Sequence, residues 1–435
     1  MAMRLITGGI YLAKLAIEQR RREIEQELRR LVSKEMRPAR SAYWWYQLFA
    51  RRIMRDGELR AQAMRFVDVF PALKNPEGIN RHIKEYFAAG PHSSSLLFRG
   101  IVGAGRFPVA KHAMALMAGA AVGAMAGHFT IPAEPPKIIK SVKDIRRRGA
   151  EYSFDILGEQ VLSEEEADIY KQKYLKSIGL LRGFNCPVNL SLKLSSLYSQ
   201  FDPLAKEATR REVAKRLKEI ARPVKDSGGS LTIDMEQFYL RGLIWEIAKE
   251  LLSEEEFAGF ANFGIAHQAY LCESEIFLEE IIQAAKERRA SFWVRLVKGA
   301  YWDYEAIAAG QKNWPIPVYT AREQTDASFE RNADIALENY PRVKTAIGSH
   351  NLSSVAYVMA KQEFLGLPKN AVEFQTLYGL GTPLIRPLKE MGYPVRVYVG
   401  TGNTLEGMSY LARRLLENTS QMSSAFFVEQ GRIRR

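Results

Sequence analysis

From about residue 150 onward, short runs rich in β-branched and aromatic residues alternate with charged helical stretches. Strand and helix alternating eight times predict a parallel (β/α)8 barrel rather than an open sheet. The fold class is therefore α/β. The expected strands are Tyr152–Leu157, Val188–Leu194, Ser230–Met235, Phe263–Ala269, Phe292–Val297, Thr345–Ser349, Ala371–Leu377 and Val395–Val399.

Polar or charged residues stand near the carboxyl ends of these runs. The run Phe292–Val297 contains Arg295 and is followed by Lys298 and Gly299. An unpaired charge inside a buried strand is costly, so Arg295 predicts an anionic ligand, with a salt bridge to a nearby carboxylate as the alternative. Function gathers at the carboxyl ends of barrel strands, so we expect one site there. Other polar candidates at strand ends are Lys193, Asp234, Gln268, His350, Asn351, Gln375 and Tyr398.

The amino-terminal region has a different pattern. Leu5 to Ile17 is fairly apolar but is interrupted by Lys14 and runs on into charged residues, which predicts one long amphipathic helix ending before Pro38. The uncharged stretch 112–133 is mostly Ala, Gly and Met and predicts a close-packed helix rather than a membrane span. Pro132, Pro135 and Pro136 are expected to break this helix, and a basic linker, 137–148, to mark the domain boundary. We therefore expect a helical arm and accessory domain at 1–148 and a TIM-type barrel at 149–435.

Composition and charge narrow the class of protein. The 435 residues are 47% hydrophobic and 26% charged, which is typical of a globular protein, and the net charge is +13. Residues 1–66 hold fifteen Lys and Arg against seven Asp and Glu. With Tyr43-Trp44-Trp45-Tyr46 beside Arg51, this favours weak peripheral contact with a lipid surface, and core packing of the rings is the alternative. No nucleic-acid-binding motif is present, so nucleic acid is not expected.

The two cysteines, Cys186 and Cys272, form neither a disulfide framework nor a metal-ligand spacing. This is typical of a reducing cytosol, and no metal site is expected.

After the last expected strand, a helix carries four residues with one-face spacing. Tyr410, Arg413, Arg414 and Glu417 stand at i, i+3, i+4 and i+7. Two adjacent guanidinium groups suit a carboxylate, because planar bidentate donors match its two oxygens. A small carboxylic acid is the predicted substrate class, and a solvated charge stripe is the alternative.

A series of motifs over about residues 150–420 closely resembles the proline dehydrogenase family, particularly the catalytic domain of the bacterial proline utilisation A flavoenzymes. The motifs are Tyr152-Ser-Phe-Asp-Ile-Leu-Gly-Glu, Leu192-Lys193-Leu-Ser, Ile233-Asp234-Met235-Glu, Arg295-Leu-Val-Lys-Gly-Ala-Tyr-Trp302, Ser349-His350-Asn351, Glu373-Phe-Gln375 and Tyr410-Leu-Ala-Arg413-Arg414-Leu-Leu-Glu-Asn418. A helical region before the barrel is also usual in that family.

The resemblance implies FAD-dependent oxidation of L-proline to Δ1-pyrroline-5-carboxylate by hydride transfer, with electrons passed to a membrane quinone. It implies catalytic roles for Asp234, Arg295 and Lys193. The implied substrate-binding residues are Lys193, Asp234, Ala300, Leu377, Tyr398, Tyr410, Arg413 and Arg414, with Asp234 orienting Lys193. The implied cofactor-binding residues are Met235, Gln268, Arg295, Lys298, Gly299, Ala300, Tyr301, Trp302, His350, Asn351, Gln375 and Glu417, the last of which steadies the arginine pair.

We expect a cytoplasmic protein, with peripheral attachment to the inner face of the cell membrane as a variant of that location. The chain ends at Arg435, so we expect either a separate aldehyde dehydrogenase partner or a missing carboxyl-terminal domain. Two other hypotheses remain open at this point. One is a lyase or aldolase on the same barrel, using Lys193 or Lys298 to form a Schiff base. The other is a membrane-binding scaffold whose basic amino end is the working part.

Overall fold

The structure is a computed structural model that describes residues 2–35, 57–73, 75–87, 127, 129–158, 161–288 and 290–402. The sequence predictions for the aromatic cluster 43–46 and for most of the stretch 112–133 lie outside the described residues. So do those for Tyr410, Arg413, Arg414 and Glu417.

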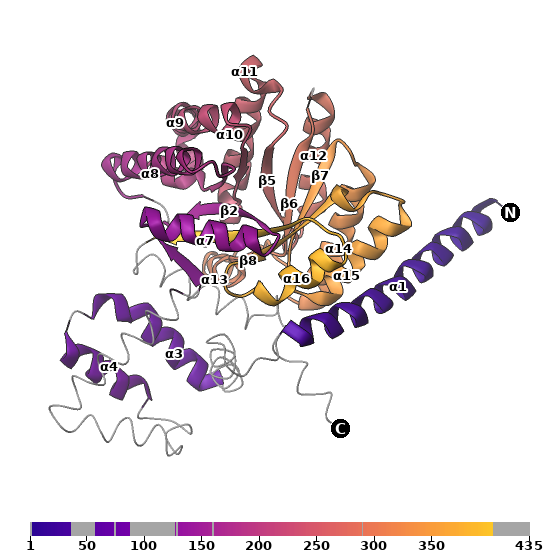
Figure 1. Ribbon diagram of the computed structural model, residues 1–435, viewed down its shortest axis with the longest axis horizontal. Coiled ribbons are helices and arrows are strands. Elements are labelled where there is room, and N and C mark those ends of the chain that lie inside the picture. The colour runs from indigo at the N-terminus through magenta and orange to yellow at the C-terminus, as the bar shows by residue number, and fades with distance from the viewer. Residues whose placement is uncertain are drawn as a thin grey trace.

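Eight parallel strands close into a barrel with helices around it (Figure 1). Each strand pairs with the next in sequence, and β9 pairs with both β8 and β2, which closes the ring. The predicted TIM-type barrel with an amino-terminal helical region is therefore confirmed. The barrel strands are β2 (Glu151–Ile156), β3 (Asn189–Leu192), β4 (Ser230–Ile233), β5 (Phe263–Gln268), β6 (Phe292–Val297), β7 (Val343–Gly348), β8 (Val372–Leu377) and β9 (Val395–Gly402).

The helices that follow these strands turn one apolar face toward the sheet. In α9 (Lys206–Asp226), for example, Val213, Leu217, Ile220 and Val224 are buried at helical spacing. The other barrel helices are α8 (Glu164–Gly183), α10 (Arg241–Ser253), α11 (Glu255–Ala258), α12 (Ser274–Glu287), α13 (Trp302–Lys312), α14 (Arg322–Glu338), α15 (Leu352–Phe364) and α16 (Thr382–Glu390). Short 3-10 helices are η1 (Phe70–Ala72), η3 (Leu194–Leu197), η4 (Pro203–Ala205), η5 (Phe238–Leu240) and η6 (Lys369–Ala371).

Two predictions for the segment before the barrel were wrong. Residues Thr130–Pro132, expected to end a helix, form strand β1, which pairs in parallel with β9. The expected basic linker is largely helix α7 (Pro135–Arg147), which buries Ile138, Ile139, Val142 and Ile145. Proline is well tolerated in the first turn of a helix, where the missing N–H has no intrahelical partner to lose. Pro135 and Pro136 therefore start α7, while Pro132 is the last residue of β1.

The long amino-terminal helix was predicted correctly and lies against the barrel's outer helices. Helix α1 (Ala2–Glu35) packs on α15, and Ile17, Ile24, Leu28 and Val32 on one of its faces join the main hydrophobic core. Two shorter helices, α3 (Gly57–Val69) and α4 (Pro76–Phe87), follow it. Among the described helices, none combines the length and the apolar character that crossing a bilayer requires.

Ion pairs hold the same helix at its middle. The Arg20 side chain reaches Glu363 at 2.7 Å, and Arg21 reaches Glu330 at 2.8 Å. The Arg21–Glu330 pair is largely shielded from solvent, with side-chain exposures of 18% and 19%. Burial raises the pKa of Glu330 to about 7, against the smaller opposing effect of Arg21. The apolar face of α1 is therefore reinforced by polar contacts that specify where on the barrel it docks.

Truncation of the buried face of α1 tests this docking. We expect Leu28→Ala to lower the free energy of unfolding by about 2–5 kcal/mol, because Leu28 is fully buried and its loss leaves a cavity. Leu12→Ala, at a position 67% exposed on the same helix, is the matched control and should change stability by less than about 0.5 kcal/mol. Urea unfolding measures both variants, and equal effects would contradict the docked arrangement.

Candidate active site at the barrel mouth

Asp234 lies at the centre of a hydrogen-bonded cluster at the carboxyl ends of the strands. Its Oδ1 accepts hydrogen bonds from Ser191 Oγ and from Arg295 Nη1, both at 2.6 Å. Its Oδ2 accepts one from the Tyr398 hydroxyl at 2.8 Å. These partners come from β3, β6 and β9, while Asp234 directly follows β4. Closure of the barrel therefore brings residues more than 150 positions apart onto one carboxylate.

Lys193 joins this cluster through a residue that the sequence analysis did not select. Its Nζ donates to both carboxylate oxygens of Asp155, at 2.8 and 2.7 Å, and lies 3.5 Å from Asp234 Oδ2. Asp155 therefore holds Lys193 more closely than Asp234 does. Asp155 stands near the carboxyl end of the first barrel strand, β2, so the rule that selected the other candidates could also have found it.

The cluster combines two acidic and two basic side chains, and their charges balance. Burial by itself raises the pKa of Asp234, but Arg295 and Lys193 outweigh it, so this pKa lies below its usual value. Burial likewise lowers the pKa of Lys193, but Asp155 and Asp234 outweigh it, so that pKa lies above its usual value. The Lys193 ammonium therefore stays protonated at neutral pH, which disfavours it as a Schiff-base nucleophile.

Arg295 is paired on two of its three guanidinium nitrogens. Nη1 donates to Asp234 and to Ser191, and Nε donates to Gln375 Oε1 at 2.7 Å. The guanidinium also lies over the Tyr398 ring, 5.2 Å from its centroid. The salt bridge that the sequence left as an alternative is thus present. Nη2, however, is buried without a hydrogen-bond partner among the described residues.

Gln268 has a second buried polar atom of this kind. Its Nε2 donates to the carbonyl of Glu236 at 3.0 Å, while its Oε1 has no partner in the described part of the chain. Buried polar atoms without partners are rare in native proteins and commonly mark a ligand or a water molecule. The isoalloxazine ring of a flavin carries hydrogen-bond acceptors and an N–H donor. An unpaired guanidinium nitrogen and an unpaired amide oxygen therefore fit the flavin that the resemblance implies.

The loop after β6 brings the backbone close to this region. Gly299 has a φ of +137°, and a Cβ there would lie 2.5 Å from the Tyr270 ring, so only glycine fits. Lys298, just before it, is buried and donates to Asp326 of α14, and burial lowers the pKa of Lys298. Its amine is therefore already engaged with a carboxylate.

Several predicted cofactor residues make hydrogen bonds to backbone groups near the barrel mouth. Trp302 Nε1 donates to the carbonyl of Tyr319 at 2.8 Å, and His350 Nε2 accepts from the Leu377 amide at 3.0 Å. Asn351 caps α15, its Oδ1 accepting from the amides of residues 353 and 354. The remaining predicted residues lie at the ends of the same strands: Met235 after β4, Gly299, Ala300 and Tyr301 after β6, and Gln375 and Leu377 near the end of β8.

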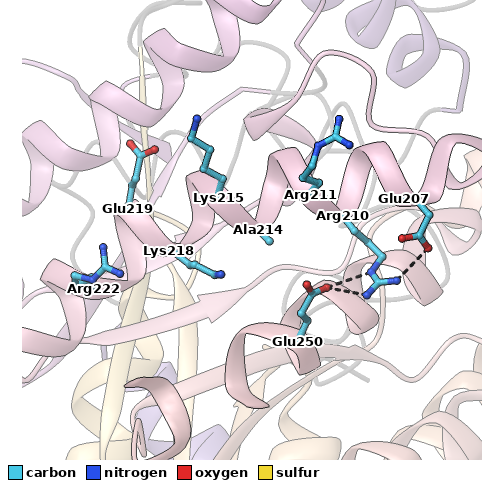
Figure 2. A pocket seen from close by; sticks show the side chains of 9 residues that line it. All are labelled: Glu207, Arg210, Arg211, Ala214, Lys215, Lys218, Glu219, Arg222 and Glu250. Carbon is cyan, nitrogen blue, oxygen red and sulfur yellow. Dashed lines mark hydrogen bonds and ion pairs between the residues drawn. The ribbon is translucent and has the colours of Figure 1, made fainter. Parts of the chain in front are cut away.

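A groove lined by several basic side chains runs along α9 (Figure 2). Its volume is about 470 Å³. Arg210 is held between Glu250 and Glu207, each at 3.1 Å, and Arg222 pairs with Glu256 at 2.6 Å. Because surface carboxylates already neutralise these guanidinium groups, the groove is a weaker candidate for an anionic ligand than the barrel mouth.

Comparison with known families gives a consistent result along the chain. Residues 138–426 match the family described as proline dehydrogenase, and residues 18–129 match the proline utilization A N-terminal domain. The bifunctional protein PutA of Salmonella typhimurium is 30% identical over 304 residues, which cover 66% of this chain and 22% of that protein. Proline dehydrogenase 1 of Bacillus subtilis is 27% identical over 299 residues, covering 68% of this chain and 87% of that one.

A solved structure agrees with these matches. Proline utilization A from Bdellovibrio bacteriovorus, inactivated by N-propargylglycine, is 32% identical, with a TM-score of 0.82. The alignment covers 95% of this chain and 43% of that chain. This chain thus spans less than half the length of that protein and about 22% of the length of the Salmonella relative.

Asp234→Asn tests whether the cluster is held together by charge. At pH 7 we expect it to lower the free energy of unfolding by about 3–5 kcal/mol, because Arg295 and Lys193 lose a buried partner. A carboxylate whose pKa is lowered on folding stabilises the fold above its unfolded pKa of about 4, and this contribution is lost as pH falls through its folded pKa. Between pH 5 and 2 the variant should therefore lose less stability than the parent protein.

Urea unfolding across this pH range measures both effects. The control is Asp144→Asn, which breaks an exposed pair with Arg147 and should stay within about 0.5 kcal/mol of the parent protein. Identical pH profiles for Asp234→Asn and the parent would rule out a charged Asp234 as the centre of the cluster.

Proposed function

This chain belongs to the proline dehydrogenase family, and we propose that it oxidises L-proline to Δ1-pyrroline-5-carboxylate with FAD as the hydride acceptor. The observation that carries the proposal is the shared cluster of Lys193, Asp234 and Arg295 at the barrel mouth. These residues stand in three separate motifs of the family resemblance. A single small ligand placed above the cluster could contact all three.

The charge balance of the cluster suits this substrate. Free L-proline is a zwitterion with a carboxylate and a secondary ammonium, so it adds no net charge to the cluster of Lys193, Arg295, Asp155 and Asp234, which is itself balanced. Lys193 would contribute a donor to the substrate carboxylate, and Arg413 and Arg414 would supply the bidentate part of the clamp. Tyr398, held by Asp234, would pack against the ring, with Tyr410, Ala300 and Leu377 as further neighbours.

The FAD would accept a hydride, which carries the two electrons of the oxidation, from a ring carbon, while the ring nitrogen gives up a proton. In this arrangement Arg295 Nη2 would donate to the isoalloxazine, and Gln268 would bond to its polar edge. The Arg295 charge would stabilise the electron-rich reduced ring, because positive charge stabilises developing negative charge most strongly where water is excluded. The chain's own contribution is therefore positioning and electrostatics.

We further propose that the electrons pass to a membrane quinone and that the protein is cytoplasmic or held at the membrane surface. This part of the proposal comes from the family resemblance alone. The basic surplus in residues 1–66 supports contact with anionic lipid. A separate or covalently attached aldehyde dehydrogenase would consume the product. The Schiff-base alternative at Lys193 loses support, because Asp155 and Asp234 favour its protonated form.

The flavin spectrum tests the proposed reaction directly. We expect the purified protein to be yellow, and anaerobic L-proline to bleach its visible absorbance, because hydride transfer reduces the flavin. A flavin-loaded sample that L-proline does not bleach would count against proline oxidation. A colourless protein trapped by borohydride with a carbonyl compound would favour the lyase hypothesis instead.

The double variant Arg413→Met/Arg414→Met tests the carboxylate clamp. It should keep its flavin but bind L-proline at least about 100-fold more weakly, because two charge-assisted hydrogen bonds of about 1.5–3 kcal/mol each are lost. The double variant Arg147→Met/Arg386→Met removes two exposed arginines and serves as a charge-matched control with unchanged affinity. Affinity is measured by titrating the flavin spectrum, and retained affinity in the first variant would refute the clamp.

A further inference from the structure

A column of buried polar side chains runs from the candidate site down the inside of the barrel. Arg295 Nε donates to Gln375 Oε1 at 2.7 Å, and Gln375 Nε2 donates to Glu373 Oε1 at 2.8 Å. Glu373 in turn accepts from Arg396 Nε at 2.7 Å and from its Nη2 at 2.8 Å. Arg396 also donates from Nη1 to the carbonyl of Tyr152 at 2.9 Å. Glu373 and Arg396 are not among the residues proposed to contact L-proline or the flavin.

The far end of the column lies at the opposite mouth of the barrel. Arg396 lines a cavity of about 560 Å³ there, together with Arg146 and Asn189. Glu373, by contrast, is only 6% exposed. Burial raises the pKa of Glu373, but Arg396 outweighs it, so the pKa lies below its usual value and the side chain is ionised. An ionised carboxylate only accepts hydrogen bonds.

This property of Glu373 decides which way the Gln375 amide points. A glutamine amide has an oxygen that accepts and a nitrogen that donates, and a free amide can present either one. Facing an acceptor-only carboxylate, Gln375 must turn its Nε2 toward Glu373. Its Oε1 then faces Arg295 and accepts a hydrogen bond from Nε. The reversed amide would set a donor against Arg295 and an acceptor against Glu373, leaving both contacts unsatisfied.

The orientation of Gln375 in turn limits the guanidinium of Arg295. Nε is bound by Gln375, and Nη1 is bound by Asp234 and Ser191. A planar guanidinium held on two of its three nitrogens cannot rotate, so the direction of Nη2 is determined. Nη2 is the nitrogen without a partner among the described residues and the one we assign to the flavin.

We propose that Glu373, clamped by Arg396, is a positioning residue that orients the Gln375 amide and thereby aims the Arg295 guanidinium at the cofactor. The expected effect on the flavin potential rests on the proposed function, whereas the orientation of Gln375 and Arg295 by Glu373 does not. Glu373 acts through two intervening residues, Gln375 and Arg295, and itself touches neither substrate nor flavin. Its loss should change the electrostatics of the flavin more than the binding of L-proline.

The test compares three variants with the parent protein. Glu373→Gln/Arg396→Gln removes both charges together, so no unpaired buried charge remains, and it frees the Gln375 amide to flip. Glu373→Asp keeps the charge but withdraws the carboxylate by one methylene, and it serves if the double variant does not fold. Glu338→Gln breaks an ion pair with Lys361 on the outside of the barrel and is the control.

The first measurement needs no cofactor. In protein labelled with 15N at arginine Nε, the Arg295 Nε–H signal is assigned by its loss in Arg295→Lys, and its exchange with solvent is followed. We expect slow exchange in the parent and in Glu338→Gln, because that N–H is buried and bonded to Gln375. Exchange should be at least tenfold faster in the double variant and intermediate in Glu373→Asp. Unchanged exchange in both variants would overturn the proposal.

The second measurement is the midpoint potential of the bound flavin. We expect the double variant to disfavour the reduced flavin by about tenfold, about 30 mV for a two-electron couple, with a smaller change in L-proline affinity. Because Glu373 acts through Gln375, the same substitutions should have no further effect on the potential in a Gln375→Leu background. An equal shift in both backgrounds would show that Glu373 acts independently of Gln375 and would overturn the proposal.

The two measurements also separate this inference from the proposed function. If the parent protein binds no flavin, or L-proline does not reduce its flavin, the proposed function fails. The exchange measurement still decides whether Glu373 positions Arg295. If the parent is reduced by L-proline but its exchange and potential match those of the double variant, the positioning role fails alone.

Discussion

The ion pair between Arg295 and Asp234 is the interaction on which the organisation of the barrel mouth depends. Both side chains are almost fully buried, and their 2.6 Å contact joins β6 to the end of β4 across the barrel. Such a pair is tolerated only when further hydrogen bonds satisfy its remaining polar atoms, and losing one partner costs about 3–5 kcal/mol. Ser191, Tyr398 and Gln375 supply those bonds from β3, β9 and β8.

The same requirement explains why the barrel interior is polar where most barrels pack branched apolar side chains. The buried charges of the cluster and of the column have partners of opposite sign: Lys193 with Asp155, Arg295 with Asp234, and Arg396 with Glu373. Apolar residues of the same strands, such as Leu190 and Ile233, are fully buried in the hydrophobic core. Successive side chains of a strand point to opposite faces, so the same strands contribute apolar residues to the hydrophobic core and charged residues to the barrel interior.

The segments before the barrel extend that hydrophobic layer. Helix α1 adds Ile17, Ile24 and Leu28 to the core on the outside of α15, and β1 adds a strand beside β9. Strand β9 therefore pairs with β1 in addition to its two neighbours in the barrel, and it carries both Tyr398 and Arg396. Most of α1, from residue 18 on, lies in the region that matches the amino-terminal domain of proline utilization A, whereas β1 follows that region.

The sequence by itself determined the barrel, because eight strand-like runs alternating with helices leave few other folds. It also located Lys193, Asp234, Arg295 and Gln268 near one mouth, since the carboxyl ends of parallel strands meet there. The linker prediction for 137–148 was wrong, because Ile138, Val142 and Ile145 have helical spacing and are buried in α7 although basic residues surround them. Only the tertiary structure decided the pairings, with Asp155 on Lys193 and Glu373 on Gln375 and Arg396. Periodicity tells which face of a strand a residue occupies. A side-chain hydrogen bond also depends on barrel closure and strand register, which bring polar atoms of residues far apart in the sequence within about 3 Å of one another.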